Sequence, residues 1–399
     1  MEEHKMLLQR SQRVLETIPI GSLGLIPLKS CEQLGRQVND YLVKWRHSSE
    51  LEHKSNIAFT GYERDSYLIP AHTPRFGSGE AKGTIDDSVR GNDLYLMVDV
   101  CNYSLTYKLY NYTNRMSPDD HFQDLKRVIA AIGGKARRLT VIMPYLYESR
   151  QHKRSARESL DCAMALQELV NMGVENILTF EAHDPLVQNA IPLHGFETVT
   201  PAYQLIKGLL ETTKGLQIDS QHMLVISPDE GGMSRAVYLA NVLGLDMGMF
   251  YKRRDYTRII NGRNPVIAHE FLGTDIEGKD MIVVDDMISS GDSMLEVIRE
   301  LKKRKAGRIY IFCTFGLFTN GLEKFDKAFE DGLFTKLLST NLVYQTPELL
   351  SRPYYVNCDM SKYIALLVDT LNHDVSISDL LDPYDRIQAL ATRYRNGEL

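Results

Sequence analysis

Residues Met281 to Met294 read Met-Ile-Val-Val-Asp-Asp-Met-Ile-Ser-Ser-Gly-Asp-Ser-Met. The apolar run at the start predicts a buried strand, which ends in the two acids Asp285 and Asp286. The Ser/Gly turn that follows predicts a sharp change of direction into a helix. A strand, a turn and a helix in this order are typical of an α/β fold with a parallel sheet.

The turn after this strand has the properties of an anion site. Backbone N–H groups at such a turn and at a helix N-terminus carry partial positive charge, so they can hold a phosphate without a permanent cation. The two carboxylates are acceptors suited to the vicinal hydroxyls of a ribose. A purely structural alternative is a strand followed by a capped helix, which needs only Asp292 or Ser293 and leaves Asp285 and Asp286 unexplained.

Outward from this stretch, short β-rich runs alternate with helical stretches from Asn56 onward, which again predicts parallel sheets. The predicted strands are 94–99, 139–144, 177–181, 223–227, 281–285 and 309–315. The predicted helices are 122–132, 159–172, 233–243 and 293–304. Residues 1–55 have apolar positions three and four apart, which predicts two helices with a loop at Pro27, used for packing or for an oligomer contact.

Two segments of the chain have similar copies further on. Residues 91–99 (Gly-Asn-Asp-Leu-Tyr-Leu-Met-Val-Asp) resemble residues 278–286 (Gly-Lys-Asp-Met-Ile-Val-Val-Asp-Asp). The segment that starts at Lys135 (Lys-Ala-Arg-Arg-Leu-Thr-Val) resembles the one that starts at Lys305 (Lys-Ala-Gly-Arg-Ile-Tyr-Ile). Matches this short also arise by chance between buried strands. A true duplication would mean two similar α/β halves that divide near residue 205.

Composition excludes several classes of protein. A chain of 399 residues is long enough for two or three domains. Its formal net charge of −6 provides no global positive field for a nucleic acid, so any anion site must be local. The five cysteines contain no CxxC pair, which disfavours a disulfide framework or a zinc cluster and favours a reducing cytoplasm. The acidic start is unlike a secretory signal, and no apolar run reaches the roughly 18 residues of a membrane helix.

The loop at 285–293 resembles the phosphoribosyl-diphosphate loop of type I phosphoribosyltransferases. Over about residues 55–382 the order of the motifs resembles that of the ribose-phosphate diphosphokinase family. The segments that carry this resemblance are Phe76-Gly-Ser-Gly-Glu80, Ser88-Val-Arg-Gly91, residues 144–154 with Arg150-Gln151, Glu181-Ala-His183, Ser227-Pro-Asp229-Glu-Gly-Gly232, Tyr251-Lys252-Arg253-Arg254 and Val375-Ser-Ile-Ser-Asp-Leu380.

The resemblance implies two tandem type I phosphoribosyltransferase-like domains, each with a mainly parallel sheet flanked by helices, after a helical N-terminal extension. We expect the extension at 1–55, the first domain at 56–205, the second at 206–382 and a tail at 383–399. The implied reaction transfers the diphosphoryl group of ATP to the anomeric hydroxyl of ribose 5-phosphate and releases AMP, for nucleotide biosynthesis. The implied cofactor is Mg²⁺. The implied assembly is a dimer-based homo-oligomer, with a hexamer as one form, without nucleic-acid or membrane partners.

The resemblance also assigns roles to individual residues. The metal ligands would be His183 and Asp229, and the cations that stabilise the transition state would be Lys252 and Arg254. The ATP-binding residues would be Phe76, Glu80, Arg150, Gln151 and His183, with Phe76 and Glu80 reaching the adenine of a neighbouring subunit. The ribose 5-phosphate residues would be Asp285, Asp286, Ser289, Ser290, Gly291, Asp292 and Ser293. Apart from the resemblance, the polar stretch 255–278 has few apolar residues to anchor it, which predicts a flap.

These residues also have purely structural interpretations. A lone histidine such as His183 is often structural, and a run such as Lys252-Arg253-Arg254 is usually a solvated face. The chain also departs from the family pattern at five positions, namely Ser78, His152, Glu181, Ser289 and Asp292. These changes keep two alternatives open: a non-catalytic regulatory homologue that binds nucleotides, and a phosphoribosyltransferase that consumes the activated sugar.

Overall fold

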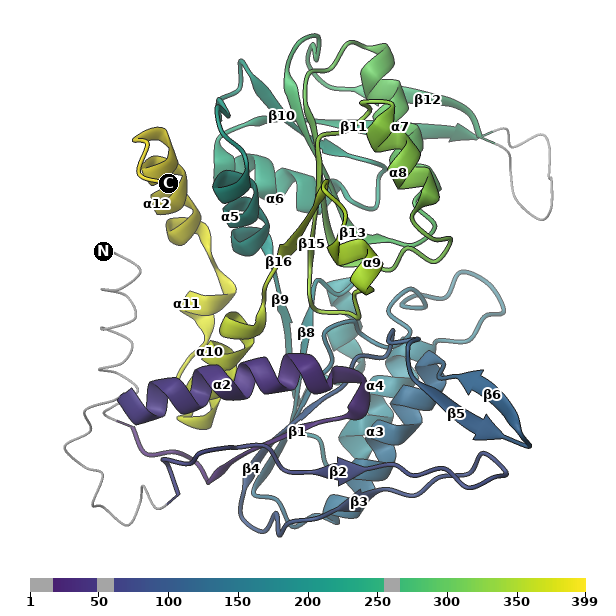
Figure 1. The fold of residues 1–399 in the computed structure, drawn as a ribbon, viewed down its shortest axis with the longest axis vertical. Coiled ribbons are helices and arrows are strands. Elements are labelled where there is room, and N and C mark those ends of the chain that lie inside the picture. Colours follow the sequence, from purple (N-terminus) through teal and green to yellow (C-terminus); the bar gives the residue numbers. More distant parts are fainter. Residues whose placement is uncertain (1–16, 49–60, 255–265) are drawn as a thin grey trace. The chain divides into compact units, whose positions relative to one another are not determined.

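The computed structural model describes residues 17–48, 61–254 and 266–399. The chain forms two compact units. Unit 1 comprises Met1–Thr200, Asn341–Tyr344 and Asp359–Asp382, and unit 2 comprises Pro201–Thr340, Gln345–Cys358 and Pro383–Leu399. Each unit is an α/β layer structure, as the alternation of strand and helix patterns predicts (Figure 1).

Unit 1 has a parallel sheet of five strands among its described residues, in the order β1-β4-β7-β8-β9. The strands are β1 (Leu23–Pro27), β4 (Asp93–Met97), β7 (Arg138–Ile142), β8 (Asn176–Phe180) and β9 (Gly195–Val199). The helices are η1 (Lys29–Cys31), α2 (Glu32–Ser48), α3 (Pro118–Ile132), α4 (Asp161–Asn171), η3 (Pro185–Ala190), α10 (Ser361–Asn372) and α11 (Ser378–Leu381). The described residues of unit 1 also include the hairpins β2 (Ala71–His72) with β3 (Thr84–Ile85) and β5 (Thr106–Leu109) with β6 (Tyr112–Arg115).

Unit 2 is built on a sheet in the order β12-β11-β10-β13-β14-β15-β16, in which only β12 is antiparallel to its neighbour among the described strands. The strands are β10 (Met223–Ser227), β11 (Asp246–Arg254), β12 (Val266–Leu272), β13 (Asp280–Ile288), β14 (Ile309–Gly316), β15 (Lys336–Thr340) and β16 (Tyr355–Cys358). The helices are α5 (Ala202–Thr212), α6 (Met233–Leu243), α7 (Asp292–Lys303), α8 (Glu323–Glu330), α9 (Pro347–Leu350) and α12 (Tyr384–Arg395).

The sheet of unit 2 is buried on both faces, because its central strands contain continuous apolar runs such as Met281 to Val284 of β13 and Met223 to Ile226 of β10. Met281 and Val283 pack with α7 and α8, while Ile282 and Val284 pack with α5, α6 and α12 on the other face. Such continuous apolar runs are expected for parallel strands covered by helices on both sides. Strand β13 is therefore held in the middle of the unit, and its carboxyl end carries the residues that the sequence analysis singled out.

The N-terminal region is helical at α2, as expected, but the loop predicted at Pro27 is wrong. Residues Leu23–Pro27 form β1, which pairs in parallel with β4 and is the edge strand of the unit 1 sheet. A five-residue apolar run does not reveal by itself whether it will find a partner strand. The helix expected nearer the N-terminus lies outside the described residues.

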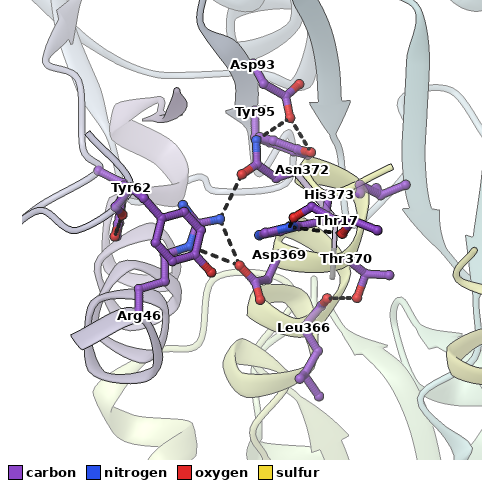
Figure 2. Close-up of polar contacts among 12 residues, drawn as sticks. Thr17, Arg46, Tyr62, Asp93, Tyr95, Leu366, Asp369, Thr370, Asn372 and His373 are labelled. Carbon is purple, nitrogen blue, oxygen red and sulfur yellow. Dashed lines mark hydrogen bonds and ion pairs between the residues drawn. The ribbon is translucent and has the colours of Figure 1, made fainter. Parts of the chain in front are cut away.

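The second domain was expected to run unbroken from 206 to 382, but the compact units are discontinuous. Residues Asn341–Tyr344 and Asp359–Asp382 belong to unit 1, and the segment after Pro383, expected as a separate tail, belongs to unit 2 through α12. The reason for the return to unit 1 is packing of α10 against α2. Figure 2 shows the polar part of this contact, in which Arg46 of α2 donates to the carboxylate of Asp369 of α10 at 2.8 and 3.0 Å.

Candidate functional site

Strand β13, the turn after it and helix α7 together form the framework of the candidate site. The strand was predicted to end at Asp285, but it continues to Ile288 because Met287 and Ile288 still pair with β14. The turn comprises Ser289, Ser290 and Gly291, and α7 begins at Asp292. The order of elements predicted from the sequence is therefore confirmed, with the strand extending three residues further at its carboxyl end than expected.

Gly291 is required by the shape of this turn. Its φ of +81° lies in the left-handed region, and a Cβ built on it would lie 2.3 Å from the Cε2 atom of Phe325. Both restrictions exclude a side chain at this position. The backbone can thus turn closely into α7, and the amide groups of the first helical turn carry partial positive charge at this point.

The twin aspartates share one cation, Arg235, in the first turn of α6. Its guanidinium nitrogens lie 3.7 Å from Oδ1 of Asp285 and 3.8 Å from Oδ2 of Asp286. Burial raises the pKa of the Asp285 carboxyl well above its usual value, Asp286 raises it further, and Arg235 opposes both effects. The sequence analysis missed Arg235; its position three residues after the Asp229-Glu-Gly-Gly232 turn, at the start of a helix, was the available signal.

Asp229 lies in the turn between β10 and α6. Its Oδ1 atom accepts the backbone N–H groups of Gly231 at 3.0 Å and Gly232 at 3.3 Å, and the hydroxyl of Ser227 donates to its carbonyl oxygen at 2.6 Å. The carboxylate is therefore held in one orientation by its own turn. Asp229 also raises the pKa of Asp285, which means that the two carboxylates act on each other electrostatically.

The acidic groups of unit 2 fit a hard divalent cation. Asp229, Asp285 and Asp286 supply carboxylate oxygens. Burial, and after it the charges of Asp286 and Asp229, raises the pKa of Asp285, so a cation beside these groups would favour the ionised carboxylate. Within the described part of the chain, no three His, Cys, Asp or Glu side chains cluster closely enough to hold a metal ion by themselves. Mg²⁺ is usually held by one or two carboxylates together with substrate phosphates and water, and this set is compatible with that mode.

The predicted catalytic cations lie on β11. Lys252 pairs with His269 and Arg254 with Val266 of the antiparallel strand β12, with a register irregularity between Arg253 and Arg254. The backbone of both residues thus belongs to the sheet of unit 2, while their side chains are outside what the structure describes. Residues 255–265 of the predicted flap also lie outside the described residues.

In unit 1, the loop from Phe76 to Glu80 is closed by two backbone hydrogen bonds, from Phe76 N to Glu80 O at 2.7 Å and from Gly79 N to Phe76 O at 2.9 Å. The ring of Phe76 is 54% exposed. The hydroxyl of Ser78 donates to Glu80 Oε2 at 2.9 Å. The Ser78 departure from the family pattern therefore acts on the carboxylate that is predicted to contact adenine.

The segment with Arg150 and Gln151 lies beside His183, also in unit 1. The rings of His152 and His183 are 5.2 Å apart, and Nε2 of His152 lies 3.6 Å from Oδ2 of Asp184. Gln151 donates to the carbonyl oxygen of Ser159 at 2.8 Å, while Arg150 and His183 are exposed. The structure thus brings the Arg-Gln-His segment and His183 together, as their predicted common task requires.

The predicted residues divide between the units. Unit 1 holds Phe76, Glu80, Arg150, Gln151 and His183, and unit 2 holds Asp229, Lys252, Arg254 and the residues from Asp285 to Ser293. The binding and catalytic roles of these residues remain predictions.

No helix within 17–48, 61–254 or 266–399 is both long and apolar enough to cross a membrane.

A mainly parallel sheet whose central strand carries two aspartates near its carboxyl end and leads through a Ser/Gly turn into a helix defines a phosphoribosyltransferase-like α/β protein. Residues 23–173 match the family model described as the N-terminal domain of ribose phosphate pyrophosphokinase, and residues 197–345 match the one described as a phosphoribosyl transferase domain. The chain belongs to the ribose-phosphate pyrophosphokinase family.

Similar proteins support this assignment. A ribose-phosphate pyrophosphokinase from Vibrio cholerae is 26% identical over 321 residues, which cover 79% of this chain and 92% of that protein. One from Pasteurella multocida is 27% identical over 315 residues, 78% of this chain and 90% of that protein. The crystal structure of phosphoribosylpyrophosphate synthetase from Mycobacterium smegmatis has the same fold, with a TM-score of 0.68 and 19% identity over 88% of this chain and 99% of that one.

Proposed function

We propose that this protein transfers the diphosphoryl group of ATP to the anomeric hydroxyl of ribose 5-phosphate, giving phosphoribosyl diphosphate and AMP. The observation that carries the proposal is the arrangement of β13, its turn and α7, in a chain that belongs to the ribose-phosphate pyrophosphokinase family. ATP and ribose 5-phosphate are the substrates, and Mg²⁺ is the metal. A cytoplasmic location and a homo-oligomer that completes the adenine site are part of the same proposal.

Ribose 5-phosphate binds at the turn after β13 in this mechanism. The amide groups of the turn and of the first residues of α7 hold the 5-phosphate, and Asp285 and Asp286 accept hydrogen bonds from the ribose hydroxyls. Arg235 lies within 4 Å of both carboxylates, so it limits their mutual repulsion and orients them. The aspartates can then face the sugar as acceptors.

The transfer itself breaks the bond between the α,β-bridging oxygen and the β-phosphorus of ATP and forms a bond from that phosphorus to the anomeric oxygen. The anomeric hydroxyl releases its proton to water, and AMP leaves with the bridging oxygen. Bound Mg²⁺ supplies charge neutralisation of the triphosphate. Lys252 and Arg254 stabilise the negative charge that develops on the transferred group, where fixed cations are most effective.

The direct test is to incubate the purified chain with ATP, Mg²⁺ and ribose 5-phosphate and to measure AMP and phosphoribosyl diphosphate. We expect the two products in equal amounts. No AMP over a range of metal and phosphate concentrations would overturn the proposal. Binding of nucleotide without turnover would favour the regulatory homologue, for which the Ser78–Glu80 hydrogen bond is the specific structural argument.

The role of Lys252 has its own test. Lys252→Ala should lower kcat by about 10²-fold or more with little change in ribose 5-phosphate binding, because the cation acts on charge that develops in the transition state. Lys303→Ala is the matched control, since Lys303 is an exposed lysine of α7 that pairs with Glu300. Unchanged turnover of the Lys252 variant would remove this assignment.

A further inference from the structure

The residue that begins helix α7 presents a difficulty for sugar-phosphate binding. Asp292 places a carboxylate at the turn where the proposed function requires a dianionic phosphate. An acidic residue in the first helical turn is favourable for the helix dipole, which explains its presence structurally. The same charge would repel a phosphate held by the neighbouring amides.

Lys324 lies opposite this carboxylate. Its Nζ atom donates to Oδ1 of Asp292 at 2.5 Å, and this hydrogen bond holds the pKa of Asp292 below its usual value. The carboxylate therefore stays ionised and neutralised by a cation. Both side chains are about half exposed, at 53% for Lys324 and 51% for Asp292.

The position of Lys324 is determined by the packing of its neighbours. Phe325, the next residue of α8, is fully buried directly beneath Gly291 of the turn. The segment between β14 and α8 is also bonded to the turn, since Thr319 N donates to Ser289 O at 3.0 Å. Helix α8 thus has a fixed place beside the turn, and Lys324 reaches Asp292 from that place.

Fold stability does not account for Lys324. An ion pair between half-exposed side chains contributes little to the free energy of unfolding. A lysine in the first turn of a helix is also unfavourable for the helix dipole, and Lys324 is the second residue of α8. The position of the pair beside the turn after β13, which the proposed function assigns to phosphate binding, gives a better explanation.

We propose that Lys324 is a positioning residue for the sugar phosphate: it neutralises Asp292 and thereby allows the turn after β13 to accept a dianion. The inference rests on the proposed function, because it concerns the same turn. Removal of the cation leaves an uncompensated carboxylate near the phosphate, which should weaken ribose 5-phosphate binding about five- to tenfold at low salt.

A double-mutant cycle tests this proposal. The dissociation constant of ribose 5-phosphate is measured by calorimetry for the full chain and for Lys324→Ala, Asp292→Asn and the double variant. We expect weaker binding for Lys324→Ala, tighter binding for Asp292→Asn, and recovery of most of the lost affinity in the double variant. In steady-state kinetics, the Lys324→Ala effect should appear in the KM for ribose 5-phosphate more than in kcat, and it should shrink as salt is added.

The matched control is Lys327→Ala, which removes an exposed lysine one turn further along α8 and should leave binding unchanged. Equal affinity of Lys324→Ala and the unmodified chain would overturn the inference. So would a double variant as weak as Lys324→Ala, because the lysine would then contact the ligand or support the fold directly. An unmodified chain that binds no ribose 5-phosphate would instead overturn the proposed function and this inference together.

Discussion

The Asp93–Arg138 ion pair of unit 1 and the Asp280–Arg308 ion pair of unit 2 are built alike but are covered differently. In each unit, an aspartate at the start of one strand accepts hydrogen bonds from Nε and Nη2 of an arginine. This arginine lies at or just before the start of the neighbouring strand in the sheet. The Asp93 side chain is 0% exposed and that of Arg138 10%, whereas Asp280 is 15% and Arg308 39% exposed. The same ionic contact is thus deeply buried in one unit and close to the surface in the other.

The backbone around these pairs also matches. Gly91 N donates to Lys135 O at 3.0 Å, and Gly278 N donates to Lys305 O at 2.9 Å. Both glycines have left-handed backbones, with φ of +76° and +77°. The residues involved are the ones that resemble each other in the sequence. We infer that the short sequence matches reflect a duplicated β–α–β unit rather than chance.

The difference between the pairs arises from one helix. In unit 1, Asn372 at the end of α10 donates to Oδ2 of Asp93 at 2.8 Å and accepts from Arg46 at 2.8 Å, as Figure 2 shows. Tyr95 also donates to Asp93, at 2.9 Å. The buried carboxylate therefore belongs to a network that joins the sheet to α2 and α10. Two copies of one contact can therefore contribute differently to the free energy of unfolding when a later segment of the chain covers only one of them.

The largest expected effect comes from Asp93→Ala. It removes the acceptor of Tyr95 and Asn372 and the counter-charge of Arg138, which is 10% exposed and keeps its hydrogen bond to the carbonyl oxygen of Leu371 at 2.6 Å. The loss of a buried ionic partner should cost unit 1 about 3–5 kcal/mol. Hydrogen exchange of the β4 amides measures the loss within unit 1. Unchanged protection of β4 would show that the network does not stabilise the sheet.

The pH dependence of unit 1 gives the next largest effect. Asp99 matches Asp286 in the repeat, and its carboxylate is buried, where it accepts Cys101 N at 2.8 Å and Tyr344 N at 2.7 Å. Burial raises the pKa of Asp99 from 3.8 to about 7. Burial, and after it the Asp99 charge, also raises the pKa of the thiols of Cys31 and Cys101. The folded state therefore binds more protons than the unfolded state between these pH values, so stability falls as pH rises.

The measurement for Asp99 compares the unmodified chain with Asp99→Asn from pH 5 to 8. From pH 5 to pH 7, the free energy of unfolding of the unmodified chain should fall by about 2 kcal/mol more than that of the variant. The difference between the two curves removes the contributions of other titrating groups, such as His121 and His373, whose pKa values are lowered by burial. Parallel curves would contradict the raised pKa.

Asp280→Ala is the counterpart of Asp93→Ala and should have a smaller effect. Arg308 is partly exposed and also donates to the carbonyl oxygen of Gly215 at 3.0 Å, so water and this contact can satisfy it. We expect a loss of about 1 kcal/mol, seen as slightly faster exchange of the β13 amides. A loss equal to that of Asp93→Ala would mean that burial does not distinguish the two pairs.

The smallest expected difference in stability is the one between the variants Gly91→Ala and Gly278→Ala. A Cβ at either glycine meets no atom within 4 Å, so each substitution adds only the strain of a left-handed backbone, about 1 kcal/mol. The two variants should therefore lose equal amounts of thermal stability. Unequal losses would show that the copies are not structurally equivalent at this turn.

Much of the candidate site could be predicted from local sequence, because its elements are contiguous. The apolar run, the twin aspartates and the Gly291 turn are neighbours along the chain, and the same is true of the turn that holds Asp229. Arg235 and Lys324 could not be predicted in this way. Each is a basic residue on a helix without a distinctive local motif. Each forms its ion pair with an acid more than thirty residues away in the chain.

The sequence alone determined the alternation of strands and helices, the turn that can hold a phosphate and the family of the protein, since these follow from apolar runs, glycine positions and short motifs. Only the tertiary structure decided that Leu23–Pro27 joins a sheet, that Asp359–Asp382 returns to unit 1, and which cations neutralise the acids of the site. The physical reason is that burial and ion pairing depend on distances between segments far apart in the chain, which no local pattern encodes.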